Sequence, residues 1–165
     1  MNRVIEPGAA HPPPTVADVM TRDVATCAPD ATLADAARIM WDHDCGFVPV
    51  VAFPGRRVEG VVTDRDACMA SLTQGKALAD LPVSVAMKAN VVTVKEGAPL
   101  GQAQALMREH QIRRLPVVDA HGRLVGVISL NDVAQSVRKP ATHVDPRDVA
   151  ATLAEVCRHR EVVTV

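Results

Sequence analysis

A hydroxyl residue and an aspartate stand three residues apart at two places in the chain. They close a phrase that occurs twice, as GVVTDRD at residues 60–66 and as GVISLND at residues 126–132, and the pairs are Thr63 with Asp66 and Ser129 with Asp132. This spacing is typical of a capping box, in which hydroxyl and carboxylate satisfy free backbone N–H groups at a helix start. The same groups could bind a ligand, since a helix start attracts phosphate and a carboxylate can accept both hydroxyls of a ribose. The local motif favours capping and leaves ligand binding open.

The repeated phrase belongs to a longer internal repeat. With a shift of 67 residues, Met20 matches Met87 and further matches follow in order; after a one-residue difference in a turn, the closing phrases match at a shift of 66, with Gly60 on Gly126 and Asp66 on Asp132. The first repeat spans residues 16–71 and the second spans residues 83–137. Residue patterning predicts strand, helix, strand, strand and helix in each repeat. The opening strands are expected at Val24–Cys27 and Val91–Val94, and the first helices begin near Thr32 and Pro99.

One repeat alone buries too little apolar surface to be stable. We therefore expect an α+β fold in which two pseudo-symmetric βαββα repeats pack sheet to sheet as one compact module. Residues 1–15 are proline-rich and expected to be disordered, and residues 72–82 form a connector. The extension at residues 138–165 has no counterpart in the repeat. We predict a helix there from Pro146 to about His159, and the final REVVTV could add a strand.

The composition limits the classes of function. Net charge is −1 and aromatic residues make up 2% of the chain, so neither a basic field nor stacking rings indicate nucleic-acid binding. No apolar run reaches the ~20 residues that span a bilayer, and the N-terminus lacks the apolar core of a signal peptide. We expect a cytoplasmic protein that binds neither nucleic acid nor membrane.

The sequence contains none of the common motifs for catalysis or metal binding. The chain contains no H-E-x-x-H, G-x-S-x-G or phosphate-loop motif, so we expect no enzyme. His43-Asp44-Cys45 places soft ligands together, but a structural metal site takes about four, and we expect no metal. A redox or enzymatic role for Cys45 or Cys68 is the weakest alternative. The four cysteines lack C-x-x-C spacing and are expected to be small hydrophobic side chains.

In the order and content of its motifs, the chain resembles a tandem cystathionine-β-synthase (CBS) domain pair, also called a Bateman module. The resemblance rests on DVMT at residues 18–21, VPVV at 48–51, LPVVD at 115–119 and the two closing phrases, and it covers residues 16–137. It implies the βαββα fold and binding of adenosyl ligands such as AMP, ADP, ATP or S-adenosylmethionine. The aliphatic walls that such ligands use suit a chain with few aromatic rings.

The resemblance also implies two sites, each built from both repeats. The first would use Ser129, Asp132 and Val127 against Thr21, Ala25, Cys45 and Gly46. The second would use Thr63, Asp66 and Val61 against Lys88, Val92, Ile112 and Arg113. In the family, the hydroxyl and the acid hold ribose and phosphate.

Arg113 and Arg114 distinguish the two repeats. In the nucleotide-sensing γ subunits of AMP-activated kinase the equivalent pair is basic and faces phosphate, and guanidinium groups suit bidentate phosphate contacts. The first repeat has Gly46-Phe47 at these positions, so the two sites need not bind the same ligand. Arg65 is a further phosphate candidate, and a solvated surface role for the arginine pair stays open.

The sequence therefore predicts a regulatory module that senses an adenine nucleotide between two repeats and signals by a conformational shift to an unidentified effector protein. The nucleotide is a regulatory ligand, and no catalytic cofactor is expected. A homodimer is expected because paired modules of this family commonly dimerise. The alternative is a dimerisation scaffold of the same fold whose clefts stay empty.

Overall fold

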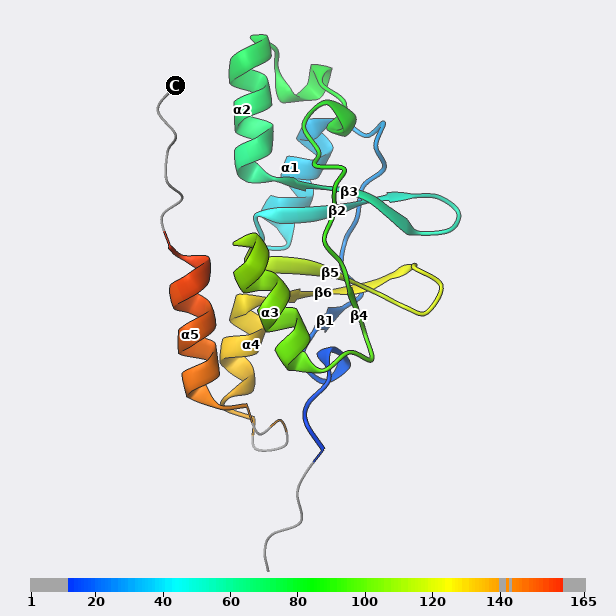
Figure 1. The fold of residues 1–165 in the computed structure, drawn as a ribbon. Helices are drawn as coiled ribbons and strands as arrows, with labels where there is room; N and C mark the ends of the chain where they lie inside the picture. Colours follow the sequence, from blue (N-terminus) through cyan, green and yellow to red (C-terminus); the bar gives the residue numbers. More distant parts are fainter. Residues whose placement is uncertain (1–11, 140–141, 143, 159–165) are drawn as a thin grey trace, which may run out of the picture.

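The computed structural model describes residues 12–139, 142 and 144–158, and Figure 1 shows two repeats one above the other. The first repeat contains α1 (Leu33–Asp42), β2 (Phe47–Ala52), β3 (Arg57–Thr63) and α2 (Asp64–Gln74). The second contains α3 (Leu100–His110), β5 (Arg114–Val118), β6 (Leu124–Ser129) and α4 (Leu130–Ser136). The expected α+β class with two helix–strand–strand–helix repeats is confirmed.

The strands form two sheets, and the opening segment of each repeat crosses between them. One sheet has the order β1-β6-β5-β4 and the other consists of β2 and β3. β1 (Thr21–Arg22) pairs with β6 of the second repeat, where Thr21 lies opposite Val127, whereas Cys27 bridges Val50 of the first repeat. The predicted strand at Val24–Cys27 is therefore wrong. That stretch passes from one sheet to the other, and Asp23, with a φ of 53°, interrupts the extended run.

The second opening segment makes the matching exchange. Lys88 bridges Val61 on β3 of the first repeat, with backbone N···O distances of 3.1 and 2.9 Å. Further on, β4 (Val94–Lys95) runs parallel to β5 of its own repeat. Of the strand predicted at Val91–Val94, only Val94 is in β4. Each opening segment therefore pairs with a strand of the other repeat.

The exchange extends into the hydrophobic cores. Val16 and Val19, which begin the first repeat in the sequence, are buried in the core of the second repeat. Leu81 and Val83 are buried in the core of the first repeat, and the backbone N of Leu33 donates to the carbonyl of Leu81 at 2.8 Å. Short 3-10 helices, η1 (Val16–Asp18), η2 (Leu78–Asp80) and η3 (Val83–Val85), carry these exchanged segments. Neither core is therefore complete without residues from both repeats.

The glycines of the two closing phrases make room for the exchanged segments. A Cβ atom on Gly126 would lie 2.5 Å from the carbonyl oxygen of Thr21, closer than a real Cβ approaches any backbone atom. A Cβ atom on Gly60 would lie 2.7 Å from the Sδ atom of Met87, the matching position of the other repeat. Each glycine therefore allows a foreign backbone segment to lie against the strand that leads to the hydroxyl–aspartate pair.

The C-terminal extension forms α5 (Pro146–Val156), with Asp145 as its N-cap and Pro146 in its first turn. It packs against α3 and α4, where the Thr152 hydroxyl accepts from Arg108 Nη1 at 2.9 Å and from Gln104 Nε2 at 3.3 Å. The predicted helix is confirmed and ends three residues before His159, which lies outside the described residues with the REVVTV segment. Pro99 is the N-cap residue of α3 and precedes its first turn.

Candidate functional site

Both hydroxyl–aspartate pairs form complete capping boxes. At the start of α2, Asp66 Oδ2 accepts from the backbone N of Thr63 at 3.1 Å and from its hydroxyl at 2.6 Å, and Thr63 Oγ1 accepts from Asp66 N. At the start of α4, Asp132 Oδ2 accepts from Ser129 N at 2.8 Å and from the Ser129 hydroxyl. The capping interpretation is confirmed. Each box uses one carboxylate oxygen, Oδ2, and leaves Oδ1 available for another partner.

The same box occurs twice more at exposed helix starts. Thr32 and Asp35 form it before α1, and Thr15 and Asp18 form it before η1. The hydroxyl and backbone N–H of Thr32 lower the pKa of Asp35, and the backbone N–H of Thr15 followed by its hydroxyl lowers that of Asp18. Neither box borders any of the cavities described below. A capping box alone is thus insufficient to identify a site, and the cavity beside it becomes the deciding feature.

Cleft 1, a cavity of about 410 Å³, lies between the repeats beside the start of α4. Its lining includes six of the seven residues predicted for the first site, namely Ser129, Asp132, Val127, Thr21, Ala25 and Cys45. The Thr21 hydroxyl donates to Asp132 Oδ1 at 3.3 Å, which is a long contact. Gly46 does not line cleft 1. It lies close to Asp64 and borders two neighbouring cavities. The exchanged β1 strand has therefore gathered this site as predicted, apart from Gly46.

Cleft 2, a cavity of about 550 Å³, is the matching space of the other pair of elements. Its lining includes eight predicted residues, namely Val61, Thr63, Arg65, Lys88, Val92, Ile112, Arg113 and Arg114. Asp66 was predicted here and is absent from the lining; its Oδ1 atom lies 3.3 Å from Lys88 Nζ. Lys88 thus contacts the Oδ1 atom of Asp66, whereas in cleft 1 the Thr21 hydroxyl contacts the corresponding Oδ1 atom of Asp132.

The end of α5 contributes to cleft 2 in a way that the repeat pattern could not reveal. Val156, Cys157 and Arg158 line this cavity, and Gln111 Nε2 donates to the carbonyl of Arg158 at 3.3 Å. Arg158 also lies 3.7 Å from Glu155 on the surface of the helix. Because the extension has no counterpart in the first repeat, cleft 1 lacks an equivalent cover among the described residues. The only indication in the sequence that these residues could reach a site was the helix predicted from Pro146 to about His159.

Comparison with known proteins identifies the fold. The CBS domain model matches the chain twice, over residues 16–72 and 79–139. The chain belongs to the CBS domain family. It is 40% identical over 120 residues to the CBS domain-containing protein YhcV of Bacillus subtilis, which covers 73% of this chain and 83% of that protein.

Two solved CBS structures match the fold and carry ligands. The CBS domain pair of MJ0100, crystallised with 5-methylthioadenosine and S-adenosyl-L-methionine, superposes with a TM-score of 0.68 at 26% identity and covers 77% of this chain and 98% of that one. CBSX2 in complex with AMP gives a TM-score of 0.65 at 26% identity, covering 76% of this chain and 96% of that one. These CBS relatives bind adenosyl compounds.

The two clefts of this CBS pair differ in charge. Among the described residues, cleft 2 is lined by five cationic side chains and no acidic one; the cations are Arg65, Lys88, Arg113, Arg114 and Arg158. Cleft 1 has two cationic residues and three acidic ones, namely Arg22, Arg114, Asp23, Asp44 and Asp132. Sequence reasoning missed Arg22, Asp23 and Asp44 because their repeat positions carry no family motif. Cleft 2 therefore favours anionic ligands more strongly than cleft 1.

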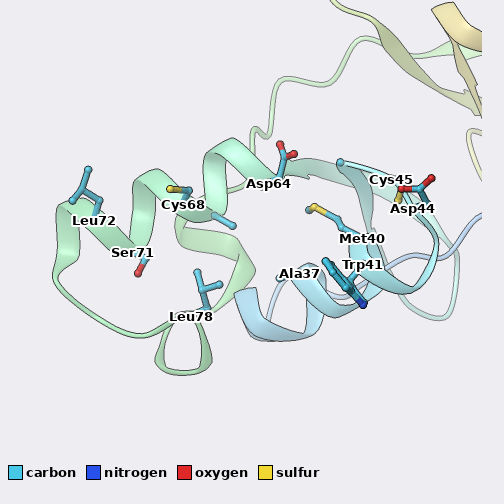
Figure 2. Close-up of a pocket in the computed structure, with 12 residues that line it drawn as sticks. Ala37, Met40, Trp41, Asp44, Cys45, Asp64, Cys68, Ser71, Leu72 and Leu78 are labelled. Atoms are coloured by element: carbon cyan, nitrogen blue, oxygen red, sulfur yellow. The ribbon is translucent and has the colours of Figure 1, made fainter.

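A further cavity of about 830 Å³ lies outside both clefts, in the groove between α1 and α2. Figure 2 shows Trp41, Leu72 and Cys68 along this α1–α2 groove. Trp41 is 87% exposed and Leu72 is 72% exposed, which is unusual for large apolar side chains. In the second CBS repeat, α5 covers the corresponding helices α3 and α4. The groove thus marks the face on which the two repeats differ most.

The described residues contain neither a metal-binding cluster nor a helix that could span a membrane. No group of three or more histidine, cysteine or acidic side chains is arranged to hold a metal ion among these residues. No described helix is long and apolar enough to cross a membrane.

Proposed function

We propose that this CBS protein is a regulatory module that binds adenine nucleotides or related adenosyl compounds in clefts 1 and 2. One observation carries the proposal: the exchanged β1 strand places Thr21 and Val127 beside a hydroxyl–carboxylate pair whose Asp132 lines a cavity. Of the two oxygens of Asp132, the cap engages Oδ2, and Oδ1 has only the long contact to Thr21. Structures of relatives with AMP and with S-adenosylmethionine support the ligand class.

The residues of cleft 1 have distinct proposed roles. Asp132 Oδ1 accepts hydrogen bonds from the ribose hydroxyls, which are charge-assisted and hence strong. Val127 and Ala25 provide apolar contacts for the adenine ring, and Cys45 contributes a small polarizable side chain. Arg114, which lines the same cavity, faces the phosphate end. The ligand is regulatory, and no catalytic cofactor is proposed.

Signalling follows from the position of the clefts. A ligand in either cleft contacts both repeats, so it stabilises the arrangement of the repeats that fits it and shifts the population toward that state. We propose no enzymatic reaction, since the clefts contain binding groups without a catalytic constellation. The effector is a protein partner that distinguishes the two arrangements.

The alternative is a scaffold of the same fold with empty clefts. It is supported by the complete capping boxes, which account for both aspartates without any ligand. The two hypotheses differ in one property: only the regulatory module gains stability when a ligand is added.

Thermal unfolding with AMP, ADP, ATP and S-adenosylmethionine at 1 mM separates them. A ligand at ~100 times its dissociation constant stabilises by about 2.7 kcal/mol, which raises the Tm by roughly 5–10 °C for a domain of this size. Asp132→Ala should remove the part of this shift that binding in cleft 1 contributes. Asp35→Ala is the matched control, because it removes the same capping box away from any cavity. It should lower the baseline Tm by a similar amount and keep the full ligand shift. No shift with any ligand would establish the scaffold.

We also propose a homodimer formed through the α1–α2 groove. The second repeat shows that a helix of this chain covers the equivalent face, and Trp41 and Leu72 leave the first repeat's face apolar and open. Trp41→Glu should convert the dimer to a monomer in light scattering coupled to size exclusion. Phe53→Glu is the control, since Phe53 is 65% exposed in the β2–β3 turn, outside the groove. A monomeric wild type would contradict the proposal.

A further inference from the structure

A third cavity adjoins both clefts and shares lining residues with each. This central chamber, about 590 Å³, shares Ser129, Asn131 and Arg114 with cleft 1. It shares Thr63, Arg65, Arg113 and again Arg114 with cleft 2. The two cap hydroxyls, Thr63 and Ser129, therefore stand at the two borders of the chamber. A ligand bound at either hydroxyl–aspartate pair would therefore lie next to the chamber, on the side of Thr63 or Ser129.

Unpaired positive charge dominates the chamber. Arg65, Arg113 and Arg114 line it, and none has a carboxylate within ion-pair distance among the described residues. Asp64 is the single acid in the lining, and its Oδ1 accepts from the backbone N of Arg65 at 2.7 Å. Guanidinium groups without a protein partner favour a doubly charged oxyanion such as phosphate.

Arg114 has a special position, because it is the one arginine that lines all three cavities. It begins β5, pairs in register with Ser129 and is half-buried, so its side chain has a short range of movement between the clefts. Its counterpart in the first repeat is Phe47, which also lines both clefts and carries no charge. The two clefts therefore have one shared cation in the wall that separates them.

We propose that the central chamber is a phosphate site common to both clefts, and that competition for Arg114 couples them. This inference rests on the proposed function and adds a relation between the two sites. When a phosphate from one cleft engages Arg114, a second phosphate entering from the other cleft loses that partner. Anionic ligands should thus weaken each other's binding by about tenfold, a typical size for coupled sites, and an uncharged nucleoside should not.

Two isoleucines provide a reporter for each cleft. Ile39 lines cleft 1 and Ile112 lines cleft 2, so Ile δ1-methyl NMR follows each site separately during a titration. Independent sites give a simple hyperbola at each methyl whatever their affinities, whereas coupled sites fit only with an interaction factor. With AMP, we expect an interaction factor of about ten. With adenosine, which lacks the phosphate, we expect a factor of one.

Arginine variants then test the shared residue. Arg114→Met should reduce the AMP interaction factor to about one. Arg22→Met is the control for cleft 1, because Arg22 lines that cleft and not the chamber; its pair with Glu96, at 3.5 Å, lies on the exposed surface. It should keep the factor near ten.

The outcomes are distinguishable. Hyperbolic AMP curves at both methyls, or coupling that persists in Arg114→Met or appears equally with adenosine, would overturn the shared-phosphate inference alone. AMP binding at a single methyl would also overturn it and leave the proposed function standing. No shift at either methyl up to 10 mM AMP would overturn both.

Discussion

Clefts 1 and 2 are built on the same backbone plan and differ in their chemistry. In each, an exchanged opening segment lies against a glycine-containing strand that ends in a capping box. The side chains at matching positions differ. Beside the aspartate, cleft 1 has Thr21 where cleft 2 has Lys88, and in the wall cleft 1 has Cys45 where cleft 2 has Ile112. The comparison teaches that a duplicated fold can keep the same capping box in both copies, while the second carboxylate oxygen contacts a hydroxyl in one copy and an ammonium group in the other.

The ligand preferences that follow are different for each cleft. Cleft 1 offers a carboxylate oxygen to a ribose and has acidic neighbours, so it should accept nucleosides and their weakly charged derivatives. Cleft 2 has its aspartate paired with Lys88 and five cations in its lining, so it should select ligands by their phosphates. The predictions below test this difference.

The largest effect should come from the two cap aspartates. Asp132→Ala removes two charge-assisted bonds to ribose, worth about 1.5–3 kcal/mol each, so adenosine affinity at cleft 1 should fall by more than about 100-fold in calorimetry. Asp66→Ala should leave that affinity unchanged, although both variants lose a cap worth about 1 kcal/mol of stability. Equal losses of adenosine binding in the two variants would contradict the distinction between the clefts.

The two glycines should also respond unequally. In Gly126→Ala the new methyl group meets backbone, the Thr21 carbonyl, so β1 must shift at a cost of about 2 kcal/mol. In Gly60→Ala it meets the Met87 side chain, whose Cβ, Cγ and Sδ atoms lie 3.2, 3.1 and 2.7 Å from the new carbon, and since this side chain is flexible the cost should be lower, about 1 kcal/mol. Denaturant unfolding measures both values. A larger loss for Gly60→Ala would show that the exchanged segments are held differently from this account.

Lys88 should control the ligand class of cleft 2. Lys88→Met frees Asp66 Oδ1, and adenosine affinity at the Ile112 methyl should rise by about tenfold while ATP affinity falls. The control is Lys95→Met, since Lys95 lies on β4 and lines neither cleft. If both nucleosides and nucleotides bind more weakly in Lys88→Met, the ammonium group contacts the ligand without blocking the ribose.

Ionic strength should produce the smallest difference. Raising NaCl from about 0.1 to 0.5 M screens the exposed cations of cleft 2, so AMP affinity there should fall by about threefold. Adenosine binding at cleft 1 should change by less than a factor of about 1.5, because the ligand carries no charge. Equal salt dependence for both ligands would remove the electrostatic basis of the comparison.

Much of this arrangement was predictable because it depends on local signals. The helix starts, the two hairpins and the capping boxes follow from hydroxyl–aspartate spacing and apolar periodicity, and they were predicted correctly. The residues of cleft 1 were found through the family resemblance, because the spacing around Thr63 and Ser129 is equally consistent with caps alone. Thr32 and Asp35, which form the same box without a cavity, show why the local motif could not decide.

The features that were missed depend on contacts distant in sequence. The strand predicted at Val24–Cys27 has suitable β-branched residues, but the segment crosses between sheets and its pairing partners lie in different repeats. The ion pair of Asp66 with Lys88 arises from the same exchange. The cover that Arg158 and its neighbours provide for cleft 2 comes from an extension without a repeat counterpart, so no internal comparison could place it.

The most direct test of ligand binding in both clefts uses the cysteines that the chain already contains. Cys45 lines cleft 1, Cys157 lines cleft 2 and Cys68 lines only the α1–α2 groove. Cys27 is an internal control, because burial raises its pKa to about 11 and keeps it a thiol at pH 7.5. Alkylation rates would be measured at each cysteine by mass spectrometry, with adenosine or ATP.

Adenosine at saturation should slow alkylation of Cys45 by about tenfold. ATP should slow alkylation of Cys157 as well as that of Cys45. Cys68 should react at an unchanged rate with either ligand, and Cys27 should stay unmodified. This pattern would establish two ligand clefts of different charge preference. Unchanged rates at both Cys45 and Cys157 with saturating ATP would contradict the account and leave the scaffold.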